Sequence, residues 1–166
     1  MGIRLNLGCG NKKLSGYIGV DFADNYSGDK PDVESDLRAL PFADGYADEV
    51  LAVHVLEHFY VWEAADVLKE WKRVLKPGGK IAIEVPCLDK IINLYFQHQG
   101  QPPVNLSMWG FYGDPSYKDP RMVHRWCYSV GALRALLETV GFKNIVEHRP
   151  KFHVEQRDMR MEAINV

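Results

Sequence analysis

The sequence predicts one α/β domain, spanning residues 1–166, built on a mostly parallel sheet. Short runs rich in β-branched residues alternate with stretches of helical periodicity, which is the pattern of a parallel sheet with crossover helices. Two late runs, residues 142–147 and 157–166, are placed to pair as a C-terminal antiparallel hairpin. With 166 residues, 46% of them hydrophobic, the chain has enough apolar material for one core.

The first third of the chain contains four short runs that are typical of strands. They cover residues 3–7, 17–21, 33–35 and 49–55. Only about ten residues separate Gly8 from the second run, fewer than a parallel crossover with its helix normally needs. We therefore expect the first helix to be reduced or absent, which would leave one side of the adjoining site open.

Two helices and a fifth strand are predicted in the rest of the chain. The first helix has one apolar stripe at i, i+3, i+4 and i+7 spacing: Ala64, Val67, Leu68, Trp71, Val74 and Leu75. Residues 76–79 should stop this helix, and residues 80–85 form the next strand. The second helix takes Ser129 as its N-cap and ends at Gly141.

Residues 94–128 interrupt this alternation and are expected to form a lid-like insertion. The segment has Gly and Pro throughout, and dense aromatics argue against disorder. Its eight aromatic residues are Tyr95, Phe96, Trp109, Phe111, Tyr112, Tyr117, Trp126 and Tyr128. Such side chains usually serve packing, although Trp109, Phe111 and Tyr112 could stack on a sugar or a planar ligand.

Charge and cysteine content exclude several classes of partner. The net charge is −2 and no basic stripe follows the chain, so nucleic acid is not expected as a partner. The one basic concentration, residues 148–160, is interpreted as a solvated hairpin face, with an anionic substrate as the alternative. Three dispersed cysteines fit neither a disulfide framework nor a cysteine zinc site, and no apolar run approaches about 18 residues. We expect a soluble, unprocessed, cytoplasmic protein without a membrane partner.

Three polar features follow three successive predicted strands. The turn Gly8-Cys9-Gly10 lets the backbone approach a ligand closely. Asp21 ends the second strand, where a carboxylate can accept both hydroxyls of a ribose. Asp36, with the backbone N–H of Leu37, is placed to read an adenine edge. Either aspartate alone fits a turn or helix cap equally well, but together with the turn they favour a nucleoside cofactor.

Four motifs resemble class I S-adenosylmethionine-dependent methyltransferases, especially the small type 11-like group. They are LNLGCG at residues 5–10, DL at 36–37 with LPF at 40–42, HVLEH at 54–58 and RVLKPGG at 73–79. The resemblance implies a Rossmann-like methyltransferase sheet, with S-adenosylmethionine as cofactor and S-adenosylhomocysteine as product. It also implies cofactor contacts from Gly8, Cys9, Gly10, Asp21, Phe22, Asp36, Leu37 and His54.

Two positions depart from related patterns. Asn6 stands where the common methyltransferase pattern has Asp or Glu, so a neutral group would anchor the amino end of the cofactor. Lys13 occupies the position of the third glycine of a dinucleotide-binding turn, which disfavours an NAD-dependent oxidoreductase. Cys9 is interpreted as a small apolar filler, since methyl transfer needs no covalent enzyme intermediate.

Methyl transfer to a hydroxyl requires a group that removes its proton, and histidine is the first candidate. His58 and His124 are the candidate bases, with Glu57 as the fallback, although a lone histidine is more often structural. The leading hypothesis is O-methylation of a small molecule or glycan, with N-methylation less favoured. The alternatives are a catalytically silent domain that binds the cofactor and, less favoured, the oxidoreductase.

The leading hypothesis assigns no metal, but one variant of it does. His54, Glu57 and His58 are spaced i, i+3, i+4, and His124 comes from the insertion. Together they resemble the Glu-x-x-Glu-His and distant His site for divalent ions in small-RNA 2′-hydroxyl methyltransferases and some ubiquinone-pathway O-methyltransferases. With histidine in the first position, such a set favours a softer ion than magnesium.

Overall fold

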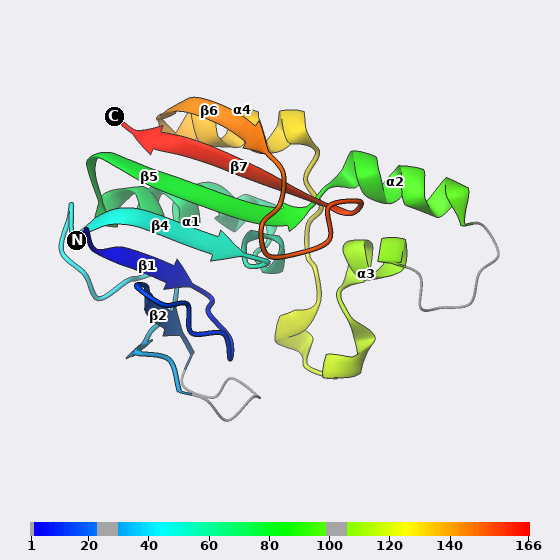
Figure 1. The fold of residues 1–166 in the computed structure, drawn as a ribbon, viewed down its shortest axis with the longest axis horizontal. Helices are drawn as coiled ribbons and strands as arrows, with labels where there is room; N and C mark the ends of the chain where they lie inside the picture. The colour runs from blue at the N-terminus through cyan, green and yellow to red at the C-terminus, as the bar shows by residue number, and fades with distance from the viewer. Residues whose placement is uncertain (1, 23–29, 99–105) are drawn as a thin grey trace.

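A seven-stranded sheet of order β3-β2-β1-β4-β5-β7-β6 runs through the molecule (Figure 1). The computed structural model describes residues 2–22, 30–98 and 106–166. The strands are β1 (Arg4–Leu7), β2 (Ile18–Asp21), β3 (Val33–Glu34), β4 (Ala47–Val53), β5 (Leu75–Pro86), β6 (Phe142–His148) and β7 (Asp158–Asn165). Neighbouring strands are parallel except that β7 is antiparallel to both β5 and β6. The mostly parallel sheet and the C-terminal hairpin are confirmed, and the insertion of β7 between β5 and β6 is a new feature.

Two helices, α1 (Val61–Val74) and α4 (Val130–Val140), cover one face of the sheet and lie behind the strands in Figure 1. In α1 the predicted apolar stripe is buried, including Trp71 at 0% exposure. In α4, Ser129 Oγ accepts the N–H of Ala132 at 3.1 Å, and Gly141 ends the helix at φ +94°. Both predicted helices are confirmed. Against them packs an apolar strand face that includes Leu5, Leu7, Val50, Ala52, Ile81, Ile83, Met159 and Met161.

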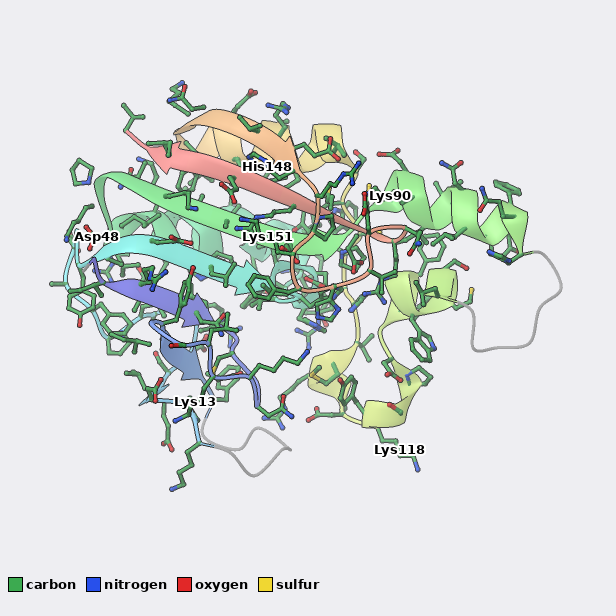
Figure 2. All side chains as sticks on the ribbon, viewed as in Figure 1. Lys13, Asp48, Lys90, Lys118, His148 and Lys151 are labelled. Carbon is green, nitrogen blue, oxygen red and sulfur yellow. The ribbon has the colours of Figure 1, made fainter. Side chains whose placement is uncertain are left out.

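The opposite face of the sheet is polar and carries no helix from the described residues. In the link between β1 and β2 only turns are present, so the expected loss of the first helix is confirmed. Ion pairs between neighbouring strands cover this face instead, with Lys80 Nζ 3.6 Å from Glu49 and 3.6 Å from Glu162. The loop between β6 and β7 also crosses it, and Figure 2 shows its Lys151 in front of the strands. Backbone N–H groups of that loop donate to the buried carboxylate of Glu84.

The segment between β5 and α4 is more regular than expected. It contains α2 (Leu88–Gln97), α3 (Leu106–Tyr112) and two 3₁₀ turns, Pro115–Tyr117 and Pro120–Met122. The insertion was predicted to start at residue 94. Its first helix instead begins at Leu88 and packs through the buried apolar side chain of Ile91. The base of the segment is closed by a hydrogen bond of 2.8 Å from the Leu88 N–H to the Tyr128 carbonyl. We call residues 88–127 the insertion; residues 99–105 lie outside the described part.

The helices of the described ranges are too short or too polar to cross a bilayer.

Candidate functional site

The turn after β1 has the backbone that its glycines predict. Gly8 and Gly10 have φ of +65° and +53°, a region that favours glycine. The Gly8 N–H donates to the Val20 carbonyl at 2.8 Å, which joins the turn to β2. A Cβ on Gly8 would overlap the side chain of Val55, whereas a Cβ on Gly10 would meet nothing within 4 Å. Gly8 is therefore required by packing, and Gly10 borders open space.

Asp21 lies directly against this turn. One carboxylate oxygen accepts the Gly10 N–H and the other accepts the Phe22 N–H, each at 2.7 Å. A carboxylate oxygen has two lone pairs, so both oxygens can still accept a further hydrogen bond. The ring of Phe22 is 40% exposed beside it. The Asp21 carboxylate, the exposed Phe22 ring and the open side of Gly10 therefore lie together where β1 and β2 end.

Two further predicted cofactor contacts, Asn6 and Cys9, are buried around the turn. Asn6 is 5% exposed, and its amide donates to the Lys12 carbonyl at 3.3 Å, so it closes the link between β1 and β2. Burial raises the pKa of the Cys9 thiol to about 11, with Asp21 adding to the shift. The thiol is protonated at neutral pH, in agreement with its interpretation as an apolar filler.

Asp36 and Leu37 follow β3 at the same edge of the sheet. The carboxylate of Asp36 is paired with the Arg38 guanidinium at 2.9–3.1 Å, which lowers the pKa of Asp36. Leu37 is 3% exposed, and its carbonyl accepts the indole N–H of Trp71 at 3.0 Å. The loop is thus fixed on α1, and its role toward an adenine stays a prediction.

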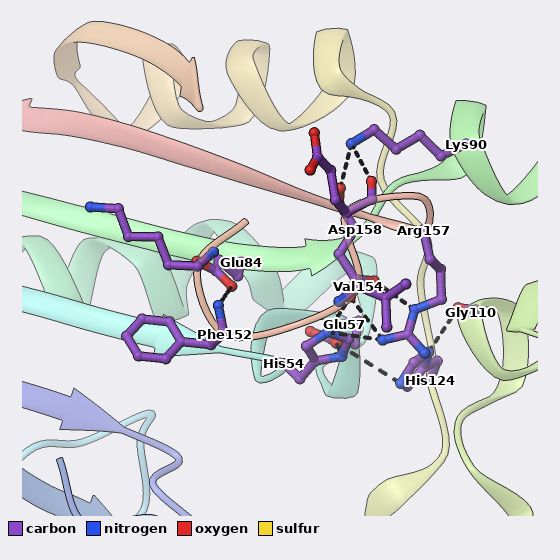
Figure 3. Close-up of polar contacts among 12 residues, drawn as sticks. His54, Glu57, Glu84, Lys90, Gly110, His124, Phe152, Val154, Arg157 and Asp158 are labelled. Atoms are coloured by element: carbon purple, nitrogen blue, oxygen red, sulfur yellow. Dashed lines mark hydrogen bonds and ion pairs between the residues drawn. The ribbon is translucent and has the colours of Figure 1, made fainter. Parts of the chain in front are cut away.

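His54 ends β4 in a left-handed conformation, with φ of +53°. Such a backbone is uncommon for a residue with a side chain and is often found at functional sites. Its Nδ1 lies 2.9 Å from Glu57 Oε1, and its Nε2 lies 3.2 Å from Asp158 Oδ2 (Figure 3). Burial alone would lower the pKa of His54, but the two carboxylates outweigh burial and raise it to about 9. The ring is thereby directed between two buried acids.

The returning end of the insertion brings His124 to the same place. The backbone N–H of Arg125 donates to the Glu57 carbonyl at 2.8 Å. His58 Nδ1 lies 3.3 Å from the Val123 carbonyl, and the rings of His58 and His124 meet edge to face at 5.0 Å. His124 Nε2 is then 3.9 Å from Glu57 Oε1. The structure therefore gathers His54, Glu57, His58 and His124 into one group, which we call the histidine cluster.

Comparisons with known proteins agree with this geometry. The family model described as "Methyltransferase domain" matches residues 5–83, from β1 to β5, including the glycine turn and His54 to His58. A methyltransferase from Archaeoglobus fulgidus matches with a TM-score of 0.64 at 19% identity, over 97% of this chain and 85% of that one. Residues 5–83 therefore match a methyltransferase domain, and the chain has the fold of S-adenosylmethionine-dependent methyltransferases. No curated protein gives a match to the sequence.

Other methyltransferases share the fold at low identity. A Thermotoga maritima protein, described as a possible histamine N-methyltransferase, has a TM-score of 0.66 at 16% identity, over 100% of this chain and 83% of that one. Phosphoethanolamine N-methyltransferase 2 of Haemonchus contortus, solved with S-adenosylhomocysteine, has a TM-score of 0.60 at 15% identity. The match covers 99% of this chain and 49% of that one. Around the matched glycine turn, the open side of Gly10 beside the Asp21 carboxylate leaves room for a cofactor.

The methyltransferase site also contains residues that the sequence did not reveal. Asp158 is 0% exposed, and Arg157 donates to it from Nε at 2.6 Å and from Nη2 at 2.9 Å. Arg160 is 2% exposed and donates to Glu84 at 2.8 Å. For Arg157 and Arg160 the interpretation as a solvated basic face was wrong, because each has a buried carboxylate partner. A signal existed: Asp158, Arg160 and Glu162 alternate with apolar residues, so both acids flank Arg160 on one face of the strand.

Aromatic side chains frame the methyltransferase site on the side of α1. The rings of Tyr60 and Trp62 stack at 4.4 Å, and Trp62 is 72% exposed. The Arg125 guanidinium lies 4.8 Å above the Tyr60 ring and so links this pair to the insertion. Of the insertion aromatics singled out from the sequence, Tyr112 is 63% exposed, while Trp109 and Phe111 are partly buried in α3. The Tyr60 and Trp62 pair was not predicted as a ligand contact.

Proposed function

We propose that this methyltransferase methylates a hydroxyl group of a small molecule or a glycan. In this proposal the backbone of Gly8 to Gly10 holds the methionine end of the cofactor, and Asp21 accepts the ribose hydroxyls. Two observations support this half of the proposal: the space beside Gly10 is open, and both Asp21 oxygens keep a lone pair. His54 lies at the end of β4, on the side expected for the sulfonium.

His58 is the proposed proton acceptor. The bound cofactor supplies an electrophilic methyl group, so this chain must hold the acceptor and remove its proton. A carbonyl can only accept, so the contact of His58 Nδ1 with the Val123 carbonyl makes Nδ1 the protonated nitrogen. Nε2 is then left to accept. Burial lowers the pKa of His58, which keeps the ring neutral at pH 7.

One observation carries the choice of a hydroxyl: His58 Nδ1 faces the Val123 carbonyl, which leaves Nε2 to accept a proton next to the buried Glu57. A neutral amine is already nucleophilic, whereas a hydroxyl gains most from a base that takes its proton. The exposed aromatic faces of Trp62 and Tyr112 support a sugar or a planar acceptor, because both stack on aromatic rings. The named acceptors of the fold relatives, histamine and phosphoethanolamine, belong to those proteins.

The test combines binding with transfer. Purified protein is titrated with S-adenosylhomocysteine by calorimetry and then incubated with methyl-labelled S-adenosylmethionine and three acceptor panels: glycans and polyols, phenols, and amines. We expect label on a hydroxyl acceptor. His58→Gln should lower turnover by about 10²–10⁴-fold, the range for loss of a general base, with S-adenosylhomocysteine affinity retained.

Two further variants make this test specific. His124→Ala should also reduce turnover while sparing binding, because its ring contacts His58. His148→Gln removes a half-exposed histidine on β6 and should change neither. Label that goes only to amines would contradict O-methylation, and full turnover in His58→Gln would contradict the base assignment.

A further inference from the structure

Glu57 is a buried carboxylate without a hydrogen bond. The residue is 1% exposed, and among the described residues neither Oε1 nor Oε2 accepts a well-formed hydrogen bond. His54 Nδ1 comes to 2.9 Å from Oε1 as an ion pair outside hydrogen-bonding geometry, so in the metal-free protein the protonated His54 ring is the cation beside Glu57. A buried carboxylate without hydrogen bonds is still costly, and a metal ion that displaced the Nδ1 proton would stabilise it further. The carboxylate therefore faces a position where a cation would stabilise it.

Two histidine nitrogens face the same position. The Gly110 carbonyl lies 2.8 Å from His124 Nδ1 and can only accept, so Nδ1 carries the proton and the Nε2 lone pair faces Glu57. His54 Nε2 lies 3.2 Å from Asp158 and 3.3 Å from Arg157 Nη2, so Nδ1 points toward Glu57, where a metal ion would replace its proton. Metal-binding histidines commonly have this arrangement, with the second nitrogen fixed by a carbonyl or a carboxylate.

We infer that His54 Nδ1, the Glu57 carboxylate and His124 Nε2 are the ligands of a divalent transition-metal ion. The three ligand atoms lie within 4.8 Å of one another. Two donor atoms about 2.1 Å from one ion lie about 3.0–3.4 Å apart at octahedral or tetrahedral angles. The pair at 2.9 Å fits, and the pair at 3.9 Å needs a small inward movement of His124.

Two histidines and one carboxylate are the donor set of zinc and iron(II) sites that keep open positions, whereas magnesium prefers oxygen ligands. This inference deepens the proposed function, because an open position would take an oxygen atom of the acceptor beside His58. His58 itself is not a ligand here, since its Nδ1 is turned to the Val123 carbonyl. It remains the proposed proton acceptor.

A second group, His54 with His153 and Asp158, is also compact but is not a cation site. The Asp158 carboxylate already accepts from Arg157 Nε and Nη2 and from the Val154 N–H. The guanidinium beside it would repel a metal ion. Asp158 and the His153 ring, 4.0 Å from the His54 ring, therefore orient His54, and His153→Ala serves to tell the two groups apart.

The experiment measures metal binding directly on the full chain, without cofactor or acceptor. Protein stripped with chelator is titrated with Zn²⁺ in competition with a chromophoric chelator, and Co²⁺ is added separately to record its visible spectrum. We expect each chain to bind one Zn²⁺ ion tightly. Glu57→Gln and His124→Ala should each lower the affinity by about 100-fold or more, and His153→Ala should lower it less because it only loosens His54. His148→Gln should stay close to the wild type. Thermal unfolding of each stripped variant checks that it is folded.

The outcomes separate this inference from the proposed function. Absence of a tight equivalent, or binding lost in His153→Ala but kept in Glu57→Gln, would overturn the metal site. Hydroxyl methylation at full rate in chelator, with no metal bound, would overturn it too and leave the proposed function standing. A tight site that needs Glu57 and His124, in a protein that methylates only amines, would support the metal site and end the O-methylation proposal.

Discussion

The two halves of the site are built in different ways. The cofactor half, around the Gly8 to Gly10 turn and Asp21, comes from one short stretch and is held by backbone hydrogen bonds to β2. The histidine cluster comes from the end of β4, the turn after it and the insertion, and is held by side-chain contacts that include Asp158 at the start of β7. The comparison shows that cofactor binding can be encoded locally, whereas the acceptor side depends on how distant segments pack.

This difference predicts how each half responds to substitution. Around the histidine cluster, a substitution that removes one member of a buried ion pair leaves the other charge buried without its partner, which is costly. In the cofactor half, the turn is held through its own backbone N–H groups, so we expect added side-chain atoms to do the damage. The predictions below test that contrast.

The largest effect on stability is expected from Arg157→Leu. This change leaves the buried Asp158 carboxylate without the two hydrogen bonds at 2.6 and 2.9 Å. Breaking a buried ion pair on one side costs about 3–5 kcal/mol. Arg149→Leu is the matched control. Arg149 is 87% exposed and pairs with Glu155 at 3.3 Å, so its loss should lower the free energy of unfolding by about 0–1 kcal/mol. Urea unfolding measures both, and equal losses would contradict the contrast.

The next effect is expected from Gly8→Ala. The added methyl would overlap the buried side chain of Val55 and would have to tolerate a φ of +65°. Overpacking and a left-handed backbone together cost about 2–4 kcal/mol. A double variant with Val55→Ala should recover part of this loss, measured as a coupling energy in a cycle of urea unfolding. A strictly additive cycle would rule out the overlap as the cause.

The cofactor half was predictable because its signals are local. A glycine turn after a strand, a carboxylate at the end of the next strand and a link too short for a helix can all be read within residues 3–21. The strand and helix alternation predicted most of the sheet for the same reason. Residues 88–93 were not predicted as part of the insertion, because they lack the glycine, proline and aromatic residues that mark residues 94–128.

The histidine cluster was only half predictable. The HVLEH motif placed His54, Glu57 and His58 together because they are neighbours in sequence. Asp158 and Arg157 could not be placed, since a terminal hairpin fits the edge of the sheet as well as a position beside β5. Asp158 reaches the end of β4 only because β7 pairs with β5, in register with residues 80–86.

A smaller effect on stability, with a large effect on binding, is expected from Gly10→Ala. Its φ of +53° costs a side chain about 1–2 kcal/mol, but no atom of the described residues lies within 4 Å of the added methyl. Gly78→Ala has the same properties, with φ of +79° and open space, far along the chain from the turn. Both variants should lose similar stability. Only Gly10→Ala should weaken S-adenosylhomocysteine binding, by about tenfold or more in calorimetry, and equal affinities would mean that the cofactor does not reach the turn.

The smallest effect is expected from Asp36→Ala, which tests whether the end of β3 belongs to the cofactor half. The Asp36 and Arg38 pair is exposed, so its loss should cost no more than about 1 kcal/mol. Because the pKa of Asp36 is lowered in the folded protein, this contribution is present above the unfolded value of about 3.9 and is lost as the pH falls below it. If the carboxylate also reads the adenine, S-adenosylhomocysteine affinity falls by about tenfold at pH 7, the value of one hydrogen bond to a charged group. Arg38→Ala removes the same ion pair but keeps the carboxylate, so affinity lost in both variants would assign the effect to the loop and not to Asp36.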